Sequence, residues 1–392
     1  MAKLKDLGII ITGNTPKTTD LKNYATLDIP FVKPSDISDN EISYIYNSEF
    51  YISEYARDKA RIIPANSILF TCIGIIGKIA INKVECSFNQ QINAIVPDDS
   101  KCLSGYLAYA LQSKKRFLQK TANAPVVPIL NKTQFSEIGI ELPNVKEQNI
   151  ITNKLDQVSN LISICKRQLS KLDELVKSRF IELFGDPISN PKGLPVKTLK
   201  QLSTLITNGN TPKGGSENYV DEGILFIRSQ NVWRNRIELD DVAYIDEETH
   251  CSLRKSSLKH KDILITKTGR INTENSSLGR AALFLGEDNS ANINGHVYLV
   301  RLDGSVVPEY VISILTSEAY RKYIRKVCVG GIDKRQINLD QVEDFPIILP
   351  SIDQQNEFAT FVEQTDKLKF EVQQSLEKLE TLKKALMQKY FG

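Results

Sequence analysis

KRQLSKLDEL, at residues 166–175, returns later in the chain as QQSLEKLETL, at residues 373–382. The segment that carries each copy continues to a Phe-Gly pair, which ends at Gly185 in the first half and at Gly392 in the second. The distance between the copies is 207 residues, far beyond the roughly 20 to 50 residues of a solenoid repeat. The repeat therefore indicates a duplicated domain.

Shorter matches keep the same order in both halves. They are Asn-Thr-Pro-Lys at 14–17 and 210–213, the apolar runs 29–32 and 224–227, the runs 67–71 and 262–266, and Leu-Pro at 142–143 and 349–350. The offset between partners is 195 to 196 early in the chain and 207 from the Leu-Pro pair onward. The second half is therefore longer, and we expect its extra residues in the polar stretch 270–279. Two similar modules on one chain can form a pseudo-twofold object.

A heptad pattern follows the Leu-Pro pair in each half. Proline restricts the residue before it to extended conformations, so each helix is expected to begin after Pro143 or Pro350. Apolar residues then recur at spacings near four and three, at Ile151, Leu155, Val158, Ile162, Cys165, Leu169, Leu172 and Val176 in the first helix and at Phe358, Val362, Val372, Leu376, Leu379, Leu382 and Leu386 in the second. Thr365 and Lys369 also fall on this seam and weaken it. Such a seam is typical of helices that pack against another helix.

These two helices are expected to be too long for their own modules to cover. About 33 to 38 residues at ~1.5 Å each make a helix of roughly 50–57 Å. Because a whole module separates the two helices, the chain can return and pair them in antiparallel fashion. We predict an antiparallel coiled coil that holds the modules apart. The alternative is that each helix packs only on its own module.

Both modules are expected to combine strands and helices. Short apolar runs bounded by Gly, Pro and Asn are typical of strands. They lie at 8–12, 29–32, 67–71, 78–81 and 92–96 in the first module and at 206, 225–228, 263–266, 280–285 and 297–302 in the second, with helical segments at 103–120 and 309–326. The predicted fold class is α/β, with two similar mixed domains separated by two long helices. The predicted domains are 1–145 and 191–350, and the helical segments are 146–190 and 351–392.

The composition is that of an ordinary soluble chain. Hydrophobic residues make up 41% and charged residues 25%, as in typical globular domains. No apolar run approaches the ~20 residues of a membrane span. The first residues lack the apolar core of a secretion signal, so we expect a cytoplasmic protein. Because the net charge is only +3, a nucleic-acid surface would have to be a local patch.

The sequence contains no recognisable catalytic motif. It lacks a phosphate loop, a nucleophile elbow and the Asn/Asp-Pro-Pro-aromatic loop of an amino-methyltransferase. The six cysteines and three histidines do not show the paired spacing of a zinc site. His250, His260 and His296 occur only in the second half, so a catalytic role would exist in one copy alone. We predict a binding protein, not an enzyme, with no catalytic residue and no metal or cofactor bound by this chain.

The order of these motifs, present twice, resembles the specificity subunit of type I restriction-modification systems. The resemblance rests on Gly-Asn-Thr-Pro at 13–16, on the strand-like runs before a Gly-containing loop, on 131–143 with its mirror 337–350, and on the Leu-Pro-x-x-x-x-Gln pattern that ends at Gln148 and Gln355. It covers essentially the whole chain. Two departures are a shorter loop after Thr71 than after Thr266, and Gln354 where the family has Glu.

The resemblance implies a function and a set of partners. Each module would be a target-recognition domain that reads one half of a bipartite double-stranded DNA site. The helices would set the spacer and dock two DNA adenine methyltransferase subunits, which carry S-adenosylmethionine. A restriction and translocation subunit that uses ATP and Mg²⁺ would join them. The alternative from another class is a protein-interaction scaffold with two binding modules and a coiled-coil rod.

Direct readout of DNA needs Arg, Lys, Asn, Gln or Ser on loops, with further contacts to phosphates. The candidate residues in the first module are Lys17, Lys33, Ser35, Gln90, Gln91 and Lys132. Those in the second are Lys213, Arg228, Ser229, Asn231, Trp233, Arg234, Lys267, Thr268, Arg270, Asn272, Asn294, Lys334 and Arg335. The alternative for each of them is a solvated loop or a strand cap.

Overall fold

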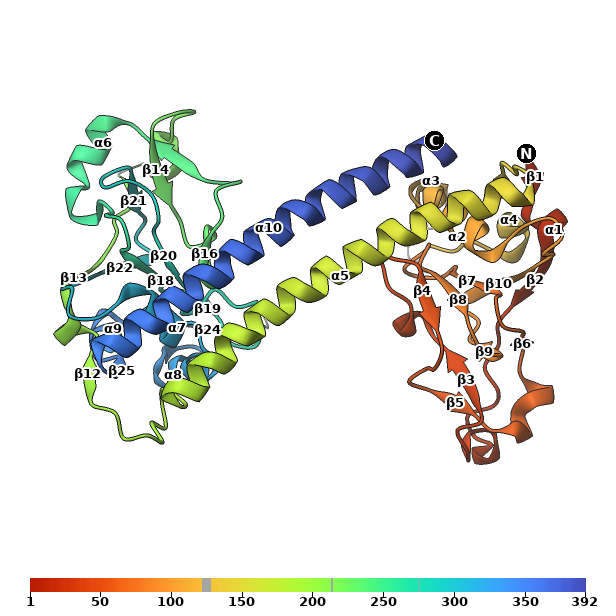
Figure 1. Cartoon of the computed structure of the whole chain (residues 1–392), viewed down its shortest axis with the longest axis horizontal. Coiled ribbons are helices and arrows are strands. Elements are labelled where there is room, and N and C mark those ends of the chain that lie inside the picture. The colour runs from red at the N-terminus through yellow and green to blue at the C-terminus, as the bar shows by residue number, and fades with distance from the viewer. Residues whose placement is uncertain (122–127, 213, 274) are drawn as a thin grey trace. The chain divides into compact units, whose positions relative to one another are not determined.

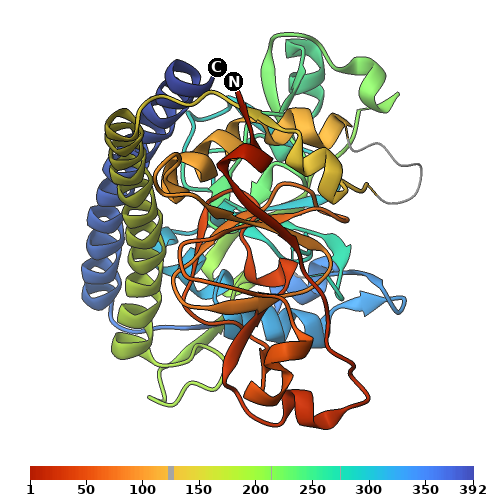
Figure 2. The same ribbon diagram turned by 90° about the vertical axis from the view of Figure 1, so that its right-hand side faces the viewer.

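The computed structural model describes residues 1–121, 128–212, 214–273 and 275–392 (Figures 1 and 2). The chain divides into two compact units. Unit 1 comprises Met1–Lys166 with Gln374–Gly392, and unit 2 comprises Arg167–Gln373. Each unit therefore contains one module and a part of each 40-residue helix, α5 (Val145–Phe184) and α10 (Ile352–Phe391). None of the helices within the described ranges is long and apolar enough to cross a membrane.

Unit 1 contains two larger sheets, in the strand orders β2–β10–β7–β8–β4 and β5–β3–β9–β6. Their strands are β2 (Gly8–Thr12), β10 (Ile92–Pro97), β7 (Ile68–Thr71), β8 (Ile79–Asn82), β4 (Ser43–Ile45), β5 (Tyr51–Ile52), β3 (Ile29–Val32), β9 (Cys86–Phe88) and β6 (Ile62–Ile63). β1 (Ala2–Lys3) pairs with β11 (Gly139–Ile140). The helices are α1 (Leu4–Leu7), α2 (Ser104–Ser113), α3 (Lys115–Thr121) and α4 (Lys132–Ser136), with short 3-10 turns at η1 (Leu21–Tyr24), η2 (Pro34–Asp36) and η3 (Glu54–Lys59).

Unit 2 repeats this plan with sheets in the orders β13–β22–β18–β20 and β17–β14–β21. Their strands are β13 (Ser203–Asn208), β22 (Val297–Leu302), β18 (Ile263–Thr266), β20 (Ala281–Leu283), β17 (Ala243–Ile245), β14 (Ile224–Ile227) and β21 (Ala291–Ile293). Smaller sheets join β12 (Val196–Thr198) to β25 (Pro346–Ile348), β15 (Val232–Trp233) to β16 (Arg236–Ile237), and β19 (Thr268–Arg270) to β24 (Lys334–Gln336) and β23 (Val329–Gly330). The helices are α6 (Glu247–Ser252), α7 (Pro308–Leu315), α8 (Glu318–Val327) and α9 (Leu339–Glu343), with 3-10 turns η4 (Lys200–Leu202), η5 (Gly215–Asn218) and η6 (Arg254–Ser256).

The repeated Ile-Leu-Phe/Ile-Thr runs form an inner strand of each large sheet. In β7, Phe70 packs into the core cluster that contains α2, whereas Leu69 packs into a second cluster. In β18, Ile265 and Leu264 likewise belong to different clusters. Because successive side chains point to opposite faces of a strand, each continuous apolar run contributes side chains to two cores.

A glycine precedes each Asn-Thr-Pro-Lys motif, and close backbone packing requires it. The Gly13 N–H donates to the Ile92 carbonyl at 3.1 Å, and the Gly209 N–H donates to the Val297 carbonyl at 3.1 Å. A Cβ at Gly13 would lie 2.2 Å from the Asn89 carbonyl oxygen, and one at Gly209 would lie 2.0 Å from the Ile293 carbonyl oxygen. Only glycine therefore fits at either position.

The glutamine of each Leu-Pro-x-x-x-x-Gln pattern joins the start of a long helix to its module. The fully buried Gln148 accepts the Leu103 N–H at 2.9 Å and donates to the Lys101 and Pro143 carbonyls, both at 2.9 Å. Gln355 accepts the Val307 N–H at 3.0 Å and donates to the Pro350 carbonyl at 3.0 Å. Because buried backbone groups need partners, these side chains hold loop and helix together.

In unit 1, the beginning of α5 and the end of α10 share the module core. Leu155 is fully buried there, and Leu386, Met387, Tyr390 and Phe391 of α10 pack against the same cluster. The Phe391 ring lies 5.2 Å from the Tyr106 ring, centroid to centroid.

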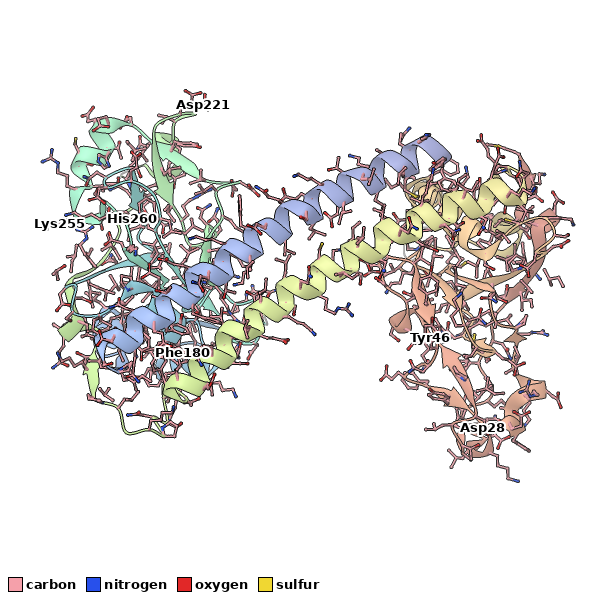
Figure 3. The ribbon with its side chains drawn as sticks, viewed as in Figure 1. Asp28, Tyr46, Phe180, Asp221, Lys255 and His260 are labelled. Carbon is pink, nitrogen blue, oxygen red and sulfur yellow. The ribbon has the colours of Figure 1, made fainter. Side chains whose placement is uncertain are left out.

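In unit 2, the end of α5 meets the beginning of α10. Phe180 of α5, labelled in Figure 3, lies 5.5 Å from Phe358 of α10 and 5.8 Å from Tyr310 of α7, between ring centroids. Nearer the middle of the helices, Lys369 pairs with Asp173 at 2.7 Å. Residue numbers rise along one helix as they fall along the other, which confirms the antiparallel pairing within this unit.

The α/β class is confirmed, and three details differ from expectation. The segment 103–120 breaks into α2 and α3, and 309–326 breaks into α7 and α8, where Ser317 caps the new helix by accepting the Tyr320 N–H at 3.2 Å. The segment 280–285 forms a strand only over Ala281–Leu283. Leu382 is 47% exposed, and the half-buried Lys383 takes its seam position, because the long alkyl stem of lysine can cover apolar surface.

Candidate nucleic-acid interface

The loop after β14 is held in shape by its own polar side chains. Asn231 is 1% exposed, accepts the Arg228 N–H at 2.9 Å, and donates to the Glu238 and Asp241 carbonyls at 3.0 and 3.1 Å. Its amide therefore forms hydrogen bonds within the loop, and its role as a DNA-contacting residue stays a prediction. Arg228 is also engaged, since its guanidinium donates to the Asp241 carbonyl and lies 3.3 Å from the Asp241 carboxylate.

Sequence reasoning missed Arg280, which lies directly beneath this loop. Its side chain is 8% exposed, and its guanidinium carbon lies 3.8 Å from the centroid of the Trp233 ring. Its Nε donates to the Ser276 carbonyl at 3.0 Å, and a terminal nitrogen donates to the Asn275 carbonyl. Burial, with the nearby charges of Arg234 and Arg236, lowers the pKa of Arg280.

A pocket of about 330 Å³ brings the two predicted loops of unit 2 together. Ser229 and Trp233 line it from the first loop, Arg270 lines it from the second, and Arg280 forms part of its wall. The remaining lining residues are Gln230, Thr273, Asn275, Ser276 and Ser277. Hydroxyl, amide and guanidinium donors thus converge on one concave surface, which suits a ligand rich in acceptor oxygens.

The three-stranded sheet places two further predicted segments side by side. β19 pairs with β24 so that Thr268 lies opposite Gln336 and Arg270 lies opposite Lys334. Arg270 and Lys334 are both exposed, and Arg270 also lies 3.4 Å from the Asp333 carboxylate. β23 and β24 form a hairpin, and its exposed Lys334 lies beside Arg270 of the neighbouring loop.

The other candidates of unit 2 are distributed around this area. Asn272 is exposed, and Arg234 pairs with Glu318 at 3.2 Å. The Lys267 ammonium lies 5.7 Å from the centroid of the Tyr298 ring. Asn294 accepts the His296 N–H at 3.1 Å, and Arg335 donates to the Gly331 carbonyl at 3.2 Å. Lys213 lies outside the described residues.

The candidates of unit 1 lie on several separate segments of the chain. Lys17, Ser35, Gln90 and Lys132 are exposed. Gln90 accepts the Thr15 hydroxyl at 2.7 Å, and the half-buried Gln91 accepts from the Asn89 amide at 2.9 Å. The Lys33 ammonium lies 3.0 Å from the centroid of the Phe50 ring, as a cation–π contact.

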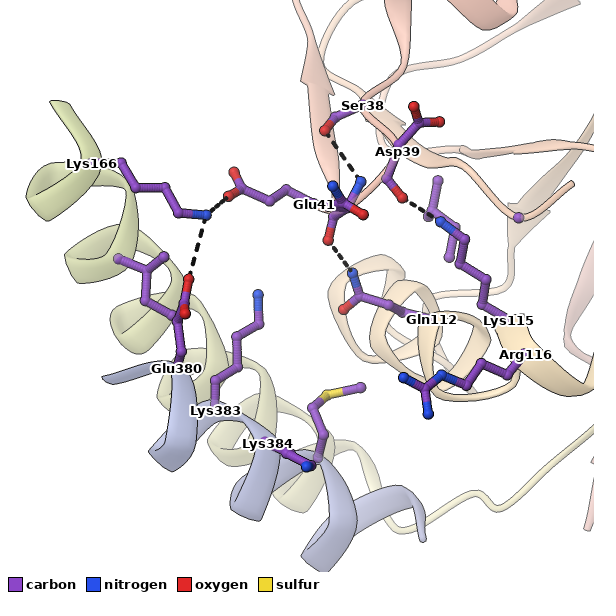
Figure 4. Close-up of a pocket in the computed structure, with 15 residues that line it drawn as sticks. Ser38, Asp39, Glu41, Gln112, Lys115, Arg116, Lys166, Glu380, Lys383 and Lys384 are labelled. Carbon is purple, nitrogen blue, oxygen red and sulfur yellow. Dashed lines mark hydrogen bonds and ion pairs between the residues drawn. The ribbon is translucent and has the colours of Figure 1, made fainter. Parts of the chain in front are cut away.

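Unit 1 has a larger pocket, of about 500 Å³, where the module meets α5 and α10 (Figure 4). Lys166 of α5 bridges Glu41 of the module and Glu380 of α10, at 2.9 and 3.7 Å. Lys115 donates to the Asp39 carbonyl, and Gln112 donates to the Asn40 carbonyl at 3.4 Å. The Lys166 bridge attaches the module to both helices, which the charge pattern of the sequence did not predict, whereas the other two contacts lie within the module.

Known proteins are similar to this chain in sequence, and a solved structure is similar to it in fold. Residues 1–174 match a family model described as the type I restriction modification DNA specificity domain. The chain is 27% identical over 370 residues to the type I restriction enzyme MjaIX specificity subunit of Methanocaldococcus jannaschii, which covers 89% of this chain and 82% of that protein. It is 23% identical over 420 residues to the StySPI specificity subunit of Salmonella potsdam, covering 100% and 88%.

The fold is similar to that of a solved specificity subunit. The crystal structure of the type I restriction-modification system S subunit from M. genitalium superposes with a TM-score of 0.61 at 14% identity, covering 100% of this chain and 95% of that chain. Both units contain the same internal frame, which consists of the two large sheets, the close-packed glycine and the buried glutamine. This duplication agrees with the sequence match over the first module and with the similarity over nearly the whole chain. Over most of its length, this chain is therefore similar in sequence to specificity subunits of type I restriction-modification systems.

Proposed function

We propose that this chain reads DNA for a type I restriction-modification assembly, with each unit recognising one half of a bipartite site. The observation that carries the proposal is a single frame used twice with different polar loops. The glycine and the buried glutamine of the frame are the same in both units, at Gly13 and Gln148 and at Gly209 and Gln355. A shared frame with different surfaces is expected where two half-sites differ in sequence.

The loops that differ follow equivalent strands. β3 is followed by Lys33-Pro34-Ser35-Asp36, whereas β14 is followed by Arg228-Ser229-Gln230-Asn231. Asp36 accepts the Lys33 N–H at 2.7 Å just as Asn231 accepts the Arg228 N–H at 2.9 Å, so the loops begin alike. Different donors at one position favour different base edges.

The residues proposed to contact DNA are those that the structure leaves exposed or places in the pocket. In unit 1 they are Lys17, Ser35, Gln90 and Lys132, and in unit 2 they are Ser229, Arg234, Arg270, Asn272 and Lys334. Their side chains supply the donors that direct readout and phosphate contact need. The side chains committed to internal contacts, among them Gln91 and Asn231, would instead shape the loops.

The proposed protein partners are two DNA adenine methyltransferase subunits and a restriction and translocation subunit. Both long helices keep large apolar side chains exposed: Ile150, Leu161 and Leu382 in unit 1, and Leu175, Ile181, Leu368 and Phe370 in unit 2. Large exposed apolar side chains on these helices would supply contact area for a protein partner. The helices would dock the methyltransferase and set the gap between half-sites, while S-adenosylmethionine, ATP and Mg²⁺ would bind to the partners.

Adenine methylation mapped in the source cell, with and without this gene, tests the proposal. Loss of methylation at one split motif on deletion, with restoration by the intact gene, is the expected result. That result would also identify both half-sites. If the methylation pattern is the same with and without the gene, in cells where the methyltransferase is expressed, the DNA-reading function is wrong and the scaffold alternative is favoured.

A further inference from the structure

The two units place a buried cation at the same position of their frames. The Lys78 N–H donates to the Thr71 hydroxyl oxygen at 3.0 Å, and the Arg280 N–H donates to the Thr266 hydroxyl oxygen at 2.9 Å. Each cation precedes the strand that pairs with the inner strand of its sheet. Lys78 is 9% exposed and Arg280 is 8% exposed, so both charges are largely removed from water.

The two cations differ in how their charge is neutralised. The Lys78 ammonium lies 3.2 Å from the Asp39 carboxylate and donates to the Pro34 carbonyl at 3.1 Å. The Arg280 guanidinium donates to the carbonyl oxygens of Asn275 and Ser276, and within the described residues no carboxylate forms an ion pair with it. Because a buried charge without an ion pair is costly, a bound anion would stabilise this guanidinium.

Burial is the largest influence on the Arg280 charge and lowers its pKa. The nearby charges of Arg234 and Arg236 act in the same direction, whereas the Glu238 carboxylate opposes them. Asp36 and Asn231 are equivalent loop residues 195 positions apart, and the same offset relates Asp39 to Arg234. At this offset, the sequence therefore has Arg234 in unit 2 where unit 1 has the carboxylate that neutralises Lys78, and Arg234 pairs with Glu318 at 3.2 Å.

The open side of this position is the pocket of unit 2, whose donors suit a phosphate group. Ser229, Thr273 and Ser276 offer hydroxyls, Gln230 offers an amide, and Arg270 adds a second guanidinium. Guanidinium groups bind phosphate oxygens with strong, charge-assisted hydrogen bonds. A neutral nucleobase would leave the buried charge uncompensated, whereas a phosphate would compensate it.

We propose that the pocket of unit 2 around Arg280 and Trp233 is a phosphate-binding site whose ligand plays the part that Asp39 plays in unit 1. The source of the phosphate rests on the proposed function, in which it is the DNA backbone. A free phosphate ion has the same chemistry. The site would then be an electrostatic anchor on one half-site only, without a counterpart in unit 1.

Trp233 allows a direct test because it is the only tryptophan in the chain. Its ring stacks on Arg280 and lines the pocket, so its fluorescence should change when an anion enters. The full-length chain is titrated with inorganic phosphate and, separately, with a short duplex of random sequence. We expect the duplex to change the emission of Trp233 and the change to disappear in Arg280→Gln.

Salt dependence provides the second readout. A lost phosphate contact lowers the slope of log affinity against log salt by about one unit, and loss of a charged hydrogen bond should weaken duplex binding roughly tenfold at moderate salt. Arg280→Lys keeps the charge and should keep the wild-type slope. Lys255→Gln removes an exposed cation that lies outside the pocket, labelled in Figure 3, and should leave the Trp233 response unchanged.

The outcomes separate the site from the proposed function. A response to both titrants, or to the duplex alone, supports the site and identifies the source. If the wild-type chain does not bind duplex, DNA reading fails. A phosphate response lost in Arg280→Gln would then still support the site. The proposal is overturned if the duplex binds without any change at Trp233, if Arg280→Gln keeps the wild-type slope, or if neither titrant produces a response.

Discussion

Unit 1 and unit 2 share their internal frame and differ in what they present on the surface. In both, an asparagine caps the helix before the last strand of the module, and Asn131 and Asn338 use the same capping box. Unit 2 gathers its polar side chains around one pocket that contains the buried Arg280. Unit 1 leaves its candidates dispersed and neutralises the equivalent Lys78 with Asp39. The frame is thus set by backbone packing, whereas the surface loops vary without disturbing it.

Exchanging one whole module should have the largest effect, because it replaces all of the proposed DNA-contacting loops of one unit. Replacing residues 1–145 with the first module of another family member should change one half-site entirely and leave the other half-site unaltered. The replacement must keep apolar side chains facing Leu386, Tyr390 and Phe391, which pack against this core. Methylation mapping of the chimera is the measurement. A change in both half-sites would contradict independent reading by the two units.

Truncating one side chain of the aromatic cluster of unit 2 should have the next largest effect. Phe358 is fully buried and contacts Phe180, Phe184 and Tyr310. Phe358→Ala should lower the free energy of unfolding by about 3–5 kcal/mol and should loosen the helix pair of this unit. Chemical denaturation of the full chain measures it.

A surface phenylalanine on the same helix provides the control for this truncation. Phe370 is 64% exposed, so Phe370→Ala should change stability little. Equal losses for the two variants would mean that the cluster does not hold the helices of unit 2 together.

Substituting the two glutamines compares how much each one stabilises its unit. Gln148→Leu removes three hydrogen bonds to backbone groups of unit 1, whereas Gln355→Leu removes two in unit 2. We expect a loss of about 3 kcal/mol for the first and about 2 kcal/mol for the second, since each unpaired group costs roughly 1–3 kcal/mol and water offsets part of it. Denaturation curves give both values.

Glu147→Gln is the matched control for the glutamine pair, because Glu147 is exposed and adjacent to Gln148. It should leave the stability of unit 1 nearly unchanged. A larger loss in Gln355→Leu than in Gln148→Leu would show that the number of hydrogen bonds does not decide the effect.

The sequence predicted the frame well because the frame depends on local patterns that occur twice. Apolar periodicity located β7 and β18, and Pro143 and Pro350 marked where the long helices begin. The seam register was wrong at Leu382, because the residue type suggested burial where Lys383 lies in the seam. Periodicity alone does not reveal which of two adjacent positions faces the partner helix when one of them is a long amphipathic side chain.

The candidate site was less predictable, because burial decides which polar residues are free. Asn231 and Ser229 look equally suitable in the sequence, yet only Ser229 reaches the pocket. Arg280 was predicted to lie in a strand, and no local pattern signals that its charge is buried and forms no ion pair with a described carboxylate. The pairs Gly77-Lys78 and Gly279-Arg280 were the available signal, since a glycine followed by a cation occurs at the same place in both copies.

The smallest predicted effect concerns the neutralised cation of unit 1. Asp39→Asn removes the counter-charge of Lys78 and should make unit 1 resemble unit 2. The slope of log duplex affinity against log salt should then become steeper by at most one unit, since one more cation becomes available to a phosphate. Binding at low salt should strengthen by a few-fold, and the Trp233 response should stay as in the wild-type chain, because the change lies in the other unit.

The double variant Asp39→Asn with Lys78→Gln tests whether the steeper salt slope comes from the Lys78 charge or from a change in the loop that contains Asp39. It removes both charges, so its salt slope should return to the wild-type value. An unchanged slope in the single variant would mean that Lys78, with 11% of its side chain exposed, is too enclosed to meet a phosphate. The difference between the units would then lie in access to the cation as well as in its counter-charge. Arg280 borders an open pocket, whereas Lys78 would stay shielded by the Pro34 carbonyl to which it donates.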